Sequence, residues 1–319
     1  MNHANANRKI ENAAQRTRCH MKRLHDARLV MLIATCILFL FDCSSHAANI
    51  SLAKVLEQAS HRADFVKPTD DELNKFYETA VDTIAARSPF EVLHERWQNI
   101  GWELSETTLN DSRVWIIHHQ SMNRRGAGIF AVRPDAEARI LLQSPHSFYD
   151  KFTRPIVVRA FERSTVRAAA WNSVHRKVQD VAHDERCFFH EFTRAFLTES
   201  QRQQQNTFVI QVHGFSQDSR KTTVGSTAEI IVSNGTRFPP NWLRMTAVNL
   251  QSVTSGVKLF PTEVSELGAT TNVQAQLVNG HDAAFMHVEL SEPARRKLRR
   301  RSDTVDEFLK CVLDAYRTM

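Results

Sequence analysis

The feature that most constrains the fold is a series of short runs of branched and aromatic residues that begins at residue 112 and alternates with helical stretches. The expected strands cover residues 113–119, 126–132, 138–143, 166–171, 207–212, 229–233 and 284–290. Helical periodicity is found near residues 186–199, 241–251 and 303–317. Strands that alternate with helices are typical of a sheet covered by helices. We therefore expect an α/β fold with a mixed sheet.

Residues 50–105 have helical character ahead of these strands. Thr69 and Glu72 have the spacing of a capping box, and Pro89 occupies a position that favours the start of a second helix. We expect residues 48–110 to form a helical N-terminal extension, followed by a catalytic α/β domain over residues 111–319.

The N-terminus has the pattern of an export signal. Residues 29–41 (LVMLIATCILFLF) form an apolar run with basic residues before it and small residues after it. Such a run is too short to span a membrane comfortably, which takes about 20 residues. We expect residues 1–47 to be a signal peptide, with the mature chain periplasmic or secreted and without a transmembrane segment. Cys43 would allow a lipoprotein, although Asp42 stands where such signals place a small residue.

Charge and glycine content exclude some functions. The chain has 41 Lys and Arg against 35 Asp and Glu, and residues 1–47 contain 7 of the former and 3 of the latter. The remaining 34 and 32 give a net charge of +2, so we expect no nucleic-acid partner. The chain has only 9 glycines and no phosphate-binding glycine motif, which argues against a nucleotide-binding enzyme. Two cysteines follow the expected signal peptide, Cys187 and Cys311. They are compatible with one disulfide or with two buried thiols.

Histidines follow two of the expected strands. His146 comes after the strand at 138–143, and His213 comes after the strand at 207–212. Ligands of open α/β sheets bind beyond the carboxyl ends of the strands, where both imidazoles would lie. Asp150 follows His146 by four residues, so a tight turn would place its carboxylate beside the first imidazole. Two histidines and a carboxylate favour a catalytic zinc site, although a single histidine at a strand end is more often a loop residue bonded to backbone.

Glu289 is a carboxylate within an apolar expected strand. Alternation places Met286, Val288 and Leu290 on one face and His287 with Glu289 on the other. A buried carboxylate needs a partner or costs several kcal/mol. Glu289 is therefore a candidate general base.

Three segments, LLQSPHSFYD, VIQVHGF and FMHVELS, resemble those of the N-formylglutamate amidohydrolase group and the phage poly-γ-glutamate hydrolases, and more remotely the zinc carboxypeptidases. The resemblance implies a phosphorylase/hydrolase-like α/β fold that binds one Zn²⁺ per chain. It implies His146, Asp150 and His213 as metal ligands and Glu289 as the base. The chain departs from the carboxypeptidases because it lacks their H-x-x-E motif and has Asp where the ligand is usually Glu.

Two further residues are candidates for substrate binding. Asn172 and Arg176 follow an expected strand, and similar Asn/Arg pairs in the carboxypeptidases hold a substrate carboxylate. An ordinary surface salt bridge is the alternative for Arg176.

Asp180, His183 and His190 offer another possible cluster, since the two histidines are seven residues apart and could share one face of a helix. A capped helix that enters the core through Phe188, Phe189 and Phe192 is the favoured alternative. The basic run at 294–301 favours a solvated helix face over a phosphate site.

Three functions are compatible with these residues. The first is an exported zinc-dependent amidohydrolase or carboxypeptidase-like peptidase that acts on acyl amino acids, γ-linked glutamyl chains or cell-wall peptides. The second is a metal-independent serine hydrolase, suggested by His213-Gly214-Phe215-Ser216, in which the His-Gly pair resembles an oxyanion turn, although the chain has no nucleophile-elbow motif. The third is a catalytically inactive envelope-binding protein on the same fold.

Overall fold

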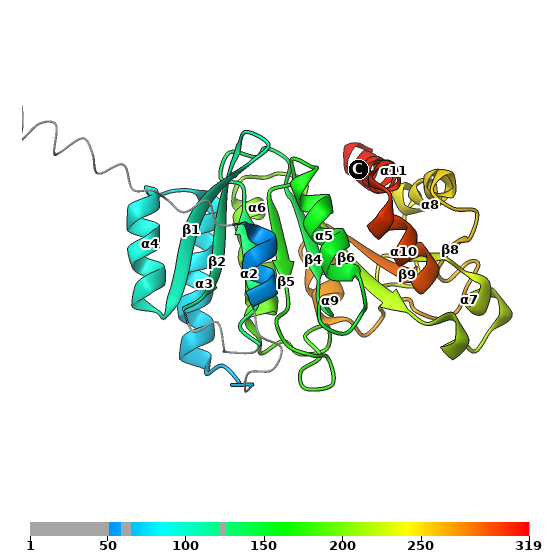
Figure 1. Ribbon diagram of the computed structural model, residues 1–319, viewed down its shortest axis with the longest axis horizontal. Coiled ribbons are helices and arrows are strands. Elements are labelled where there is room, and N and C mark those ends of the chain that lie inside the picture. The colour runs from blue at the N-terminus through cyan, green and yellow to red at the C-terminus, as the bar shows by residue number, and fades with distance from the viewer. Residues whose placement is uncertain (1–50, 59–64, 121–125, 319) are drawn as a thin grey trace, which may run out of the picture. The chain divides into compact units, whose positions relative to one another are not determined.

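A nine-stranded mixed sheet organises the residues that the computed structural model describes, namely 51–58, 65–120 and 126–318 (Figure 1). The strand order across the sheet is β1-β2-β3-β5-β4-β6-β9-β7-β8. The strands are β1 (Trp102–Leu109), β2 (Ser112–His119), β3 (Ile129–Val132), β4 (Ile140–Ser144), β5 (Ala168–Trp171), β6 (Phe208–Phe215), β7 (Ile230–Ser233), β8 (Val257–Leu259) and β9 (Ala284–Ser291). The expected signal peptide and Cys43 lie outside these residues.

The centre of the sheet is parallel. β5, β4, β6 and β9 are neighbours that run in the same direction, so their carboxyl ends meet at one edge. On one side, β1, β2 and β3 form an antiparallel meander that joins β5. On the other side, β7 runs antiparallel to β9 and parallel to β8. This arrangement confirms the expected mixed α/β sheet.

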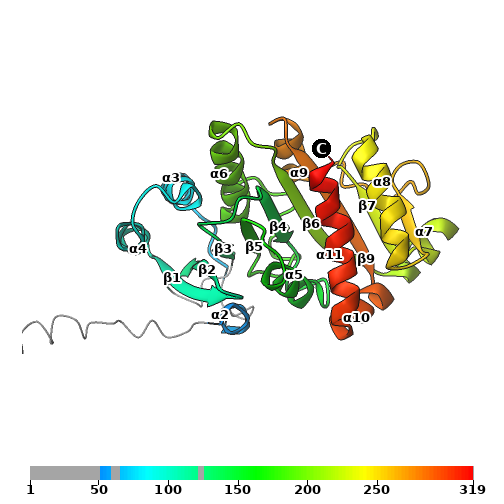
Figure 2. The same ribbon diagram turned by 90° about the horizontal axis from the view of Figure 1, so that it is seen from above.

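Helices cover both faces of the sheet (Figure 2). One face packs against α2 (Leu52–Gln58), α5 (Thr153–Glu162), α8 (Asn241–Asn249), α10 (Glu292–Arg300) and α11 (Ser302–Arg317). The other face packs against α3 (Asp70–Ala85), α4 (Phe90–Asn99), α6 (Phe188–Arg202) and α9 (Val273–Asn279). The short α7 (Thr223–Thr227) follows β6. Among the described residues, no helix combines the length and the apolar character that a membrane crossing needs.

Alternation along the central strands divides the core into two layers. In β6, Phe208, Ile210 and Val212 pack with the α5 and α11 side, whereas Val209 packs with the α6 and α9 side. In β9, Met286, Val288 and Leu290 belong to the first layer and Phe285 to the second. His287 and Glu289 therefore face the α6 and α9 side, as the alternation predicts. The polar positions of both strands lie toward their carboxyl ends.

The N-terminal helices form largely as expected. Thr69 Oγ1 accepts a hydrogen bond from the backbone N–H of Glu72 at 3.2 Å, and Glu72 Oε2 accepts one from the N–H of Thr69 at 2.8 Å, which completes the capping box. The expectation of helix up to residue 105 is wrong at its end. Residues 102–109 form β1, which pairs with β2 along its whole length because Trp102 and Leu104 are buried on one face while Glu103 is not. The described residues belong to one compact unit.

Two other expectations are decided by the backbone and the core. The strand expected over 126–132 begins only at Ile129, because Gly126 and Gly128 adopt φ values of +84°, which an extended strand does not use. Cys187 and Cys311 are both free and buried. Cys311 belongs to the α11 layer and Cys187 to the α6 layer, on opposite faces of the sheet, so they are two thiols rather than a disulfide.

Candidate metal centre

His146 and Asp150 are brought together by the loop that follows β4. The backbone N–H of Asp150 donates to the carbonyl of His146 at 2.9 Å, so the loop closes one helical turn. This turn places Asp150 Oδ2 3.2 Å from His146 Nδ1, and both side chains are buried. The hydroxyl of Thr153 donates to the Asp150 carbonyl at 2.8 Å and fixes the end of the turn. The four-residue spacing thus produces the pairing expected from the sequence.

His213 reaches the same point from the neighbouring strand. It lies within β6, which continues to Phe215, rather than in a loop beyond the strand. Its Nδ1 is 3.1 Å from His146 Nδ1 and 3.9 Å from Asp150 Oδ2. Asp150 Oδ2 also accepts a hydrogen bond from the backbone N–H of Gly214 at 2.9 Å, which ties the loop to β6. The structure therefore brings the three residues that the sequence proposes as ligands into one cluster.

Hydrogen bonds at the far side of each ring define which nitrogen carries the proton. His146 Nε2 lies 2.8 Å from Asp180 Oδ1, and His213 Nε2 lies 2.7 Å from Gln211 Oε1. Gln211 presents this oxygen because its amide nitrogen donates to Gln143 and Asn272 donates to the same oxygen at 2.6 Å. Both partners are acceptors, so each Nε2 holds a hydrogen. In the neutral rings, both Nδ1 atoms then present lone pairs.

With both rings neutral, the cluster therefore consists of three acceptors that face one another in a buried space. Two lone pairs and a carboxylate oxygen at these distances repel unless a proton or a cation lies between them. Ligand bonds of 2.0–2.1 Å in tetrahedral geometry imply separations of roughly 3.3 Å between ligand atoms. The three observed separations of 3.1, 3.2 and 3.9 Å are close to that value. The donor set and its geometry thus fit a zinc-like cation.

The acidities of these groups follow from their surroundings. Burial opposes a charge on His146, but hydrogen bonds to Asp150 and Asp180 prevail and raise the pKa of its imidazole. Burial and the neighbouring His287 and His146 hold the pKa of His213 well below its usual range, so this ring is neutral. Burial also opposes ionisation of Asp180, but His146 and Arg176 lower its pKa and keep it a carboxylate.

Glu289 and His287 lie beside His213 on the adjacent strand. The register pairs Glu289 with His213 and His287 with Gln211. The His287 ring is 4.5 Å from the His213 ring, and His287 Nε2 is 3.6 Å from Glu289 Oε1. Burial, reinforced by Asp150, raises the pKa of Glu289 to about 8. Burial, with His146 nearby, lowers the pKa of His287 to about 3. A carboxyl group poised near neutral pH at this position is suited to proton transfer.

Arg295 is a site residue that sequence reasoning missed, because it stands in a basic run that looks like a solvated helix face. Unlike the exposed Arg296 and Arg299 of α10, it is buried. Its guanidinium donates to the carbonyls of Phe215 and Leu290 at the ends of β6 and β9. It lies directly over Gly214, where an added Cβ would come within 2.1 Å of Arg295 Nη1. The glycine after His213 is thus required by the arginine above it.

The two expected substrate-binding residues lie in different environments. Arg176 is partly exposed and donates to Asp180 Oδ2 at 2.6 Å, so it is linked to His146 through that carboxylate. The buried side-chain amide of Asn172 instead donates to the carbonyl of Val174 at 3.0 Å and accepts from the backbone N–H of Val174 at 3.2 Å. These two hydrogen bonds shape the turn after β5. Contact of either residue with substrate stays a prediction.

His183 and His190 do not share a helix face, and the favoured alternative, a helix that enters the core through Phe188, Phe189 and Phe192, is the one observed. α6 begins at Phe188, and His183 lies in a preceding turn with its Nδ1 3.0 Å from the carbonyl of Thr271. Asp180, the third residue of that candidate cluster, instead lies beside His146, with its Oδ1 2.8 Å from His146 Nε2. The sequence thus singled out Asp180 but grouped it with the wrong histidines.

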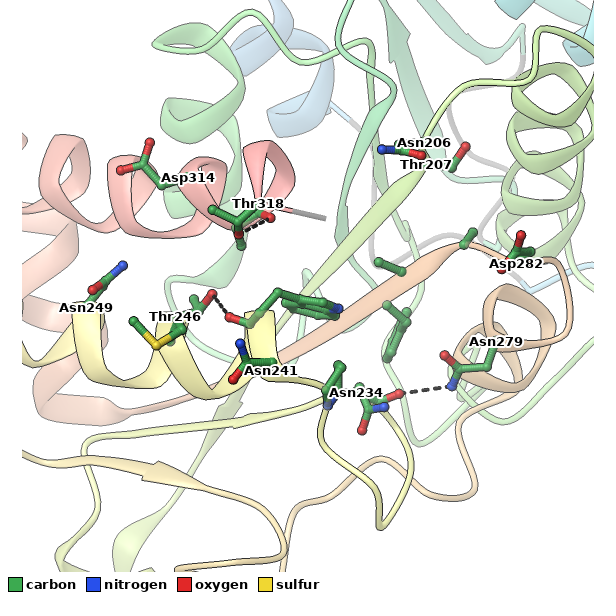
Figure 3. Close-up of a pocket in the computed structure, with 17 residues that line it drawn as sticks. Asn206, Thr207, Asn234, Asn241, Thr246, Asn249, Asn279, Asp282, Asp314 and Thr318 are labelled. Atoms are coloured by element: carbon green, nitrogen blue, oxygen red, sulfur yellow. Dashed lines mark hydrogen bonds between the residues drawn. The ribbon is translucent and has the colours of Figure 1, made fainter.

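A cavity of about 600 Å³ lies elsewhere in the fold (Figure 3). Its lining includes Thr207, Ala284 and Phe285 at the beginnings of β6 and β9, whereas His213 and Glu289 lie toward the other ends of these strands. Asn241 and Asn249 of α8 also line it, and no lysine, arginine or histidine does. The cavity is therefore separate from the candidate metal centre and does not suit an anionic substrate.

Comparisons with known proteins find a likeness among solved structures. No protein-family model and no curated protein matches the sequence. Among solved structures, the chain is similar to N-formylglutamate amidohydrolase from Ralstonia eutropha JMP134, with 12% identity, a TM-score of 0.44, and coverage of 60% of this chain and 98% of that one. The chain is 11% identical to gene product Atu2144 from Agrobacterium tumefaciens, with a TM-score of 0.44 and coverage of 57% of this chain and 92% of that one. It is 8% identical to a Shewanella denitrificans OS-217 protein provisionally named a carboxypeptidase A, with a TM-score of 0.40 and coverage of 76% of this chain and 69% of that one.

Proposed function

We propose that this protein is an exported, zinc-dependent hydrolase that cleaves an amide bond in a carboxylate-bearing substrate. The observation that carries the proposal is the cluster of three buried acceptor atoms on His146, Asp150 and His213, with Glu289 on the adjacent strand. Zinc held there would polarise the scissile carbonyl and lower the pKa of a neighbouring water molecule.

The protein's own residues supply the proton transfers. Glu289 accepts a proton from the attacking water in its carboxylate form and delivers it to the leaving amine. Its raised pKa makes it a stronger base than an exposed glutamate, and a nearby cation would favour its ionised form. Asp180 and Gln211 hold the two imidazoles with Nδ1 turned inward.

Substrate recognition is proposed to use Arg176. Its side chain is 35% exposed, and its guanidinium carbon lies 5.5 Å from the centre of the Tyr149 ring. Its Nη2 donates to Asp180. A guanidinium with free donors suits a carboxylate. Acyl amino acids, γ-linked glutamyl chains and cell-wall peptides all carry such a group. The serine-hydrolase alternative is disfavoured, because both nitrogens of His213 are engaged within the cluster and neither serves Ser216.

Metal analysis and hydrolysis assays test the proposal together. The purified wild type is expected to contain about one zinc per chain, and His213→Ala is expected to lose it. Glu289→Gln is the matched variant that keeps the metal and loses hydrolysis of an N-acyl amino acid or a poly-γ-glutamate chain. A folded wild type that binds no zinc would overturn the proposal. A zinc-loaded wild type that binds such substrates without cleaving them would instead favour the envelope-binding alternative.

A further inference from the structure

Cationic side chains gather on one face of the fold, on two segments that contain α5 and α10. Residues 151–163 and 292–301 together carry ten Lys and Arg against two Asp and Glu. The chain after residue 47 has a net charge of only +2, so the remainder of it is net negative. The two helices are in contact, because Arg159 on α5 donates to the carbonyls of Leu298 and Arg299 on α10. Together the two segments form the basic surface.

We propose that the basic surface docks the protein onto a bilayer that contains anionic phospholipid. Clusters of about four to eight Lys and Arg on a helical surface are typical of binding to anionic lipid, because each cation is attracted to the negatively charged headgroups. This inference goes beyond the proposed function and does not depend on it, since none of the metal ligands or the candidate base belongs to the basic surface.

The ring of Phe152 is the point on which three cations of the basic surface converge. Lys151 Nζ lies 5.1 Å from the centre of this ring, and the guanidinium carbons of Arg299 and Arg296 lie at 4.7 and 5.7 Å. Among the described residues, neither Lys151 nor Arg299 forms an ion pair, and Arg296 pairs with the partly exposed Glu292. Like charges held this close repel one another. A negatively charged surface laid against them would offset that repulsion.

Carboxylates of the fold neutralise little of the remaining charge. Arg163 forms an ion pair with Asp306 of α11. Arg301 forms another with Asp303. Both pairs are exposed, and exposed ion pairs are weak enough to be exchanged for a lipid phosphate. Arg300 is exposed and has no ion pair in the described part of the chain. The basic surface therefore keeps most of its positive charge toward solvent.

The place where the chain enters the fold favours a bilayer over other polyanions. α2 packs on α5, and Arg154 Nη1 donates to the carbonyl of Leu56 at 3.2 Å. Figure 2 shows α2, α5 and α10 on the same face of the sheet. In the sequence, α2 closely follows the apolar run at 29–41 and Cys43. Attachment to a membrane through either of these would hold the basic surface beside the bilayer.

Co-sedimentation with lipid vesicles tests the inference. The wild type is expected to bind vesicles of an equal mixture of phosphatidylglycerol and phosphatidylcholine more tightly than vesicles of phosphatidylcholine alone. Neutral vesicles report any binding through the apolar run. Added NaCl should weaken the binding to anionic vesicles, because salt screens exposed charges. A variant that combines Arg296→Gln, Arg299→Gln and Arg300→Gln is expected to bind the anionic vesicles about 100-fold more weakly.

The matched control removes the same charge elsewhere. It combines Lys67→Gln, Lys75→Gln and Lys221→Gln, all at exposed positions outside the basic surface. This variant is expected to bind the anionic vesicles as the wild type does. A chelator in every sample makes the measurements independent of metal.

Three results would overturn the inference. The first is equal binding of the wild type to anionic and neutral vesicles, and the second is an equal loss of affinity in the two combined variants. The third is tighter binding of the wild type to a duplex DNA oligonucleotide than to the anionic vesicles, which would identify a nucleic acid as the partner. If the basic-surface variant does not fold, the salt series on the wild type decides, because binding that NaCl leaves unchanged would contradict an electrostatic surface.

Discussion

His146 Nδ1 and His213 Nδ1 face each other at 3.1 Å although 67 residues separate them in the sequence. The contact exists because β4 and β6 are parallel neighbours, and because a polar acceptor holds the opposite nitrogen of each ring. Asp180 and Gln211 thus determine the direction of the lone pairs. The metal affinity of this cluster should depend on these two acceptors as well as on the ligands.

Replacement of Asp180 by Ala tests this dependence. The substitution removes the acceptor of His146 Nε2–H and leaves the ring free to turn. Loss of such an orienting partner typically weakens metal binding by about 10–100-fold. Competition with a chromogenic chelator measures the change. Asp314→Ala is the control, because its carboxylate on α11 bonds only Arg317 in the described part of the chain. Equal affinities in the two variants would show that Asp180 does not orient His146.

Gly214 is expected to tolerate no side chain. Gly214→Ala would place a methyl group 2.1 Å from Arg295 Nη1, and this guanidinium is held by two carbonyls. Overpacking of this kind costs about 1–3 kcal/mol in the free energy of unfolding. The matched control is Gly280→Ala, where the nearest atoms lie at ordinary distances of 3.4 and 3.5 Å. Urea unfolding compares the two. A Gly214→Ala protein as stable as Gly280→Ala would contradict the packing described here.

Glu289 should make the stability of the metal-free protein depend on pH. Its pKa is raised from 4.5 to about 8 by burial and by Asp150, so the folded protein retains a proton that the unfolded chain releases. Its contribution to stability is therefore fully present below about pH 4.5 and is lost as pH rises through about 8. The expected slope is roughly 1 kcal/mol per pH unit within this window. Urea unfolding in the presence of a chelator should show that Glu289→Gln has a smaller slope. Parallel profiles for the two proteins would contradict this.

The grouping of His146, Asp150 and His213 was predicted partly from local spacing and partly from the rule that ligands of open α/β sheets bind beyond the carboxyl ends of the strands. The turn from His146 to Asp150 depends on four-residue spacing, and the faces of β9 follow from alternation. The structure contains both the turn and the predicted faces of β9, because each depends on residues that are close in the sequence. The strands of the parallel centre were found for the same reason, since their branched residues stand in short, separate runs.

The parts that were missed depend on contacts between distant segments. The start of β1 was included in the helical region, because the alternating burial of its residues depends on pairing with β2. Arg295 looks like any member of a basic helix until α10 packs against the ends of β6 and β9. Asp180 approaches His146 across 34 residues, and no periodicity encodes that distance. No sequence signal pointed to these long-range contacts, whereas the rule on strand ends did anticipate the approach of His213 to His146.

The two cysteines of the described chain should remain unreactive thiols even in an oxidising compartment. Cys187 and Cys311 pack in layers on opposite faces of the sheet, so no disulfide can join them without unfolding. Burial raises the pKa of both thiols, and the thiolate is the reactive form. We expect iodoacetamide to label neither residue in the native protein and both in urea, as read by peptide mass mapping. Cys187 should be the slower of the two under partial denaturation, because it is fully buried at the start of α6 whereas Cys311 is 5% exposed. A cross-linked pair of peptides containing residues 187 and 311 would contradict the arrangement of the two layers.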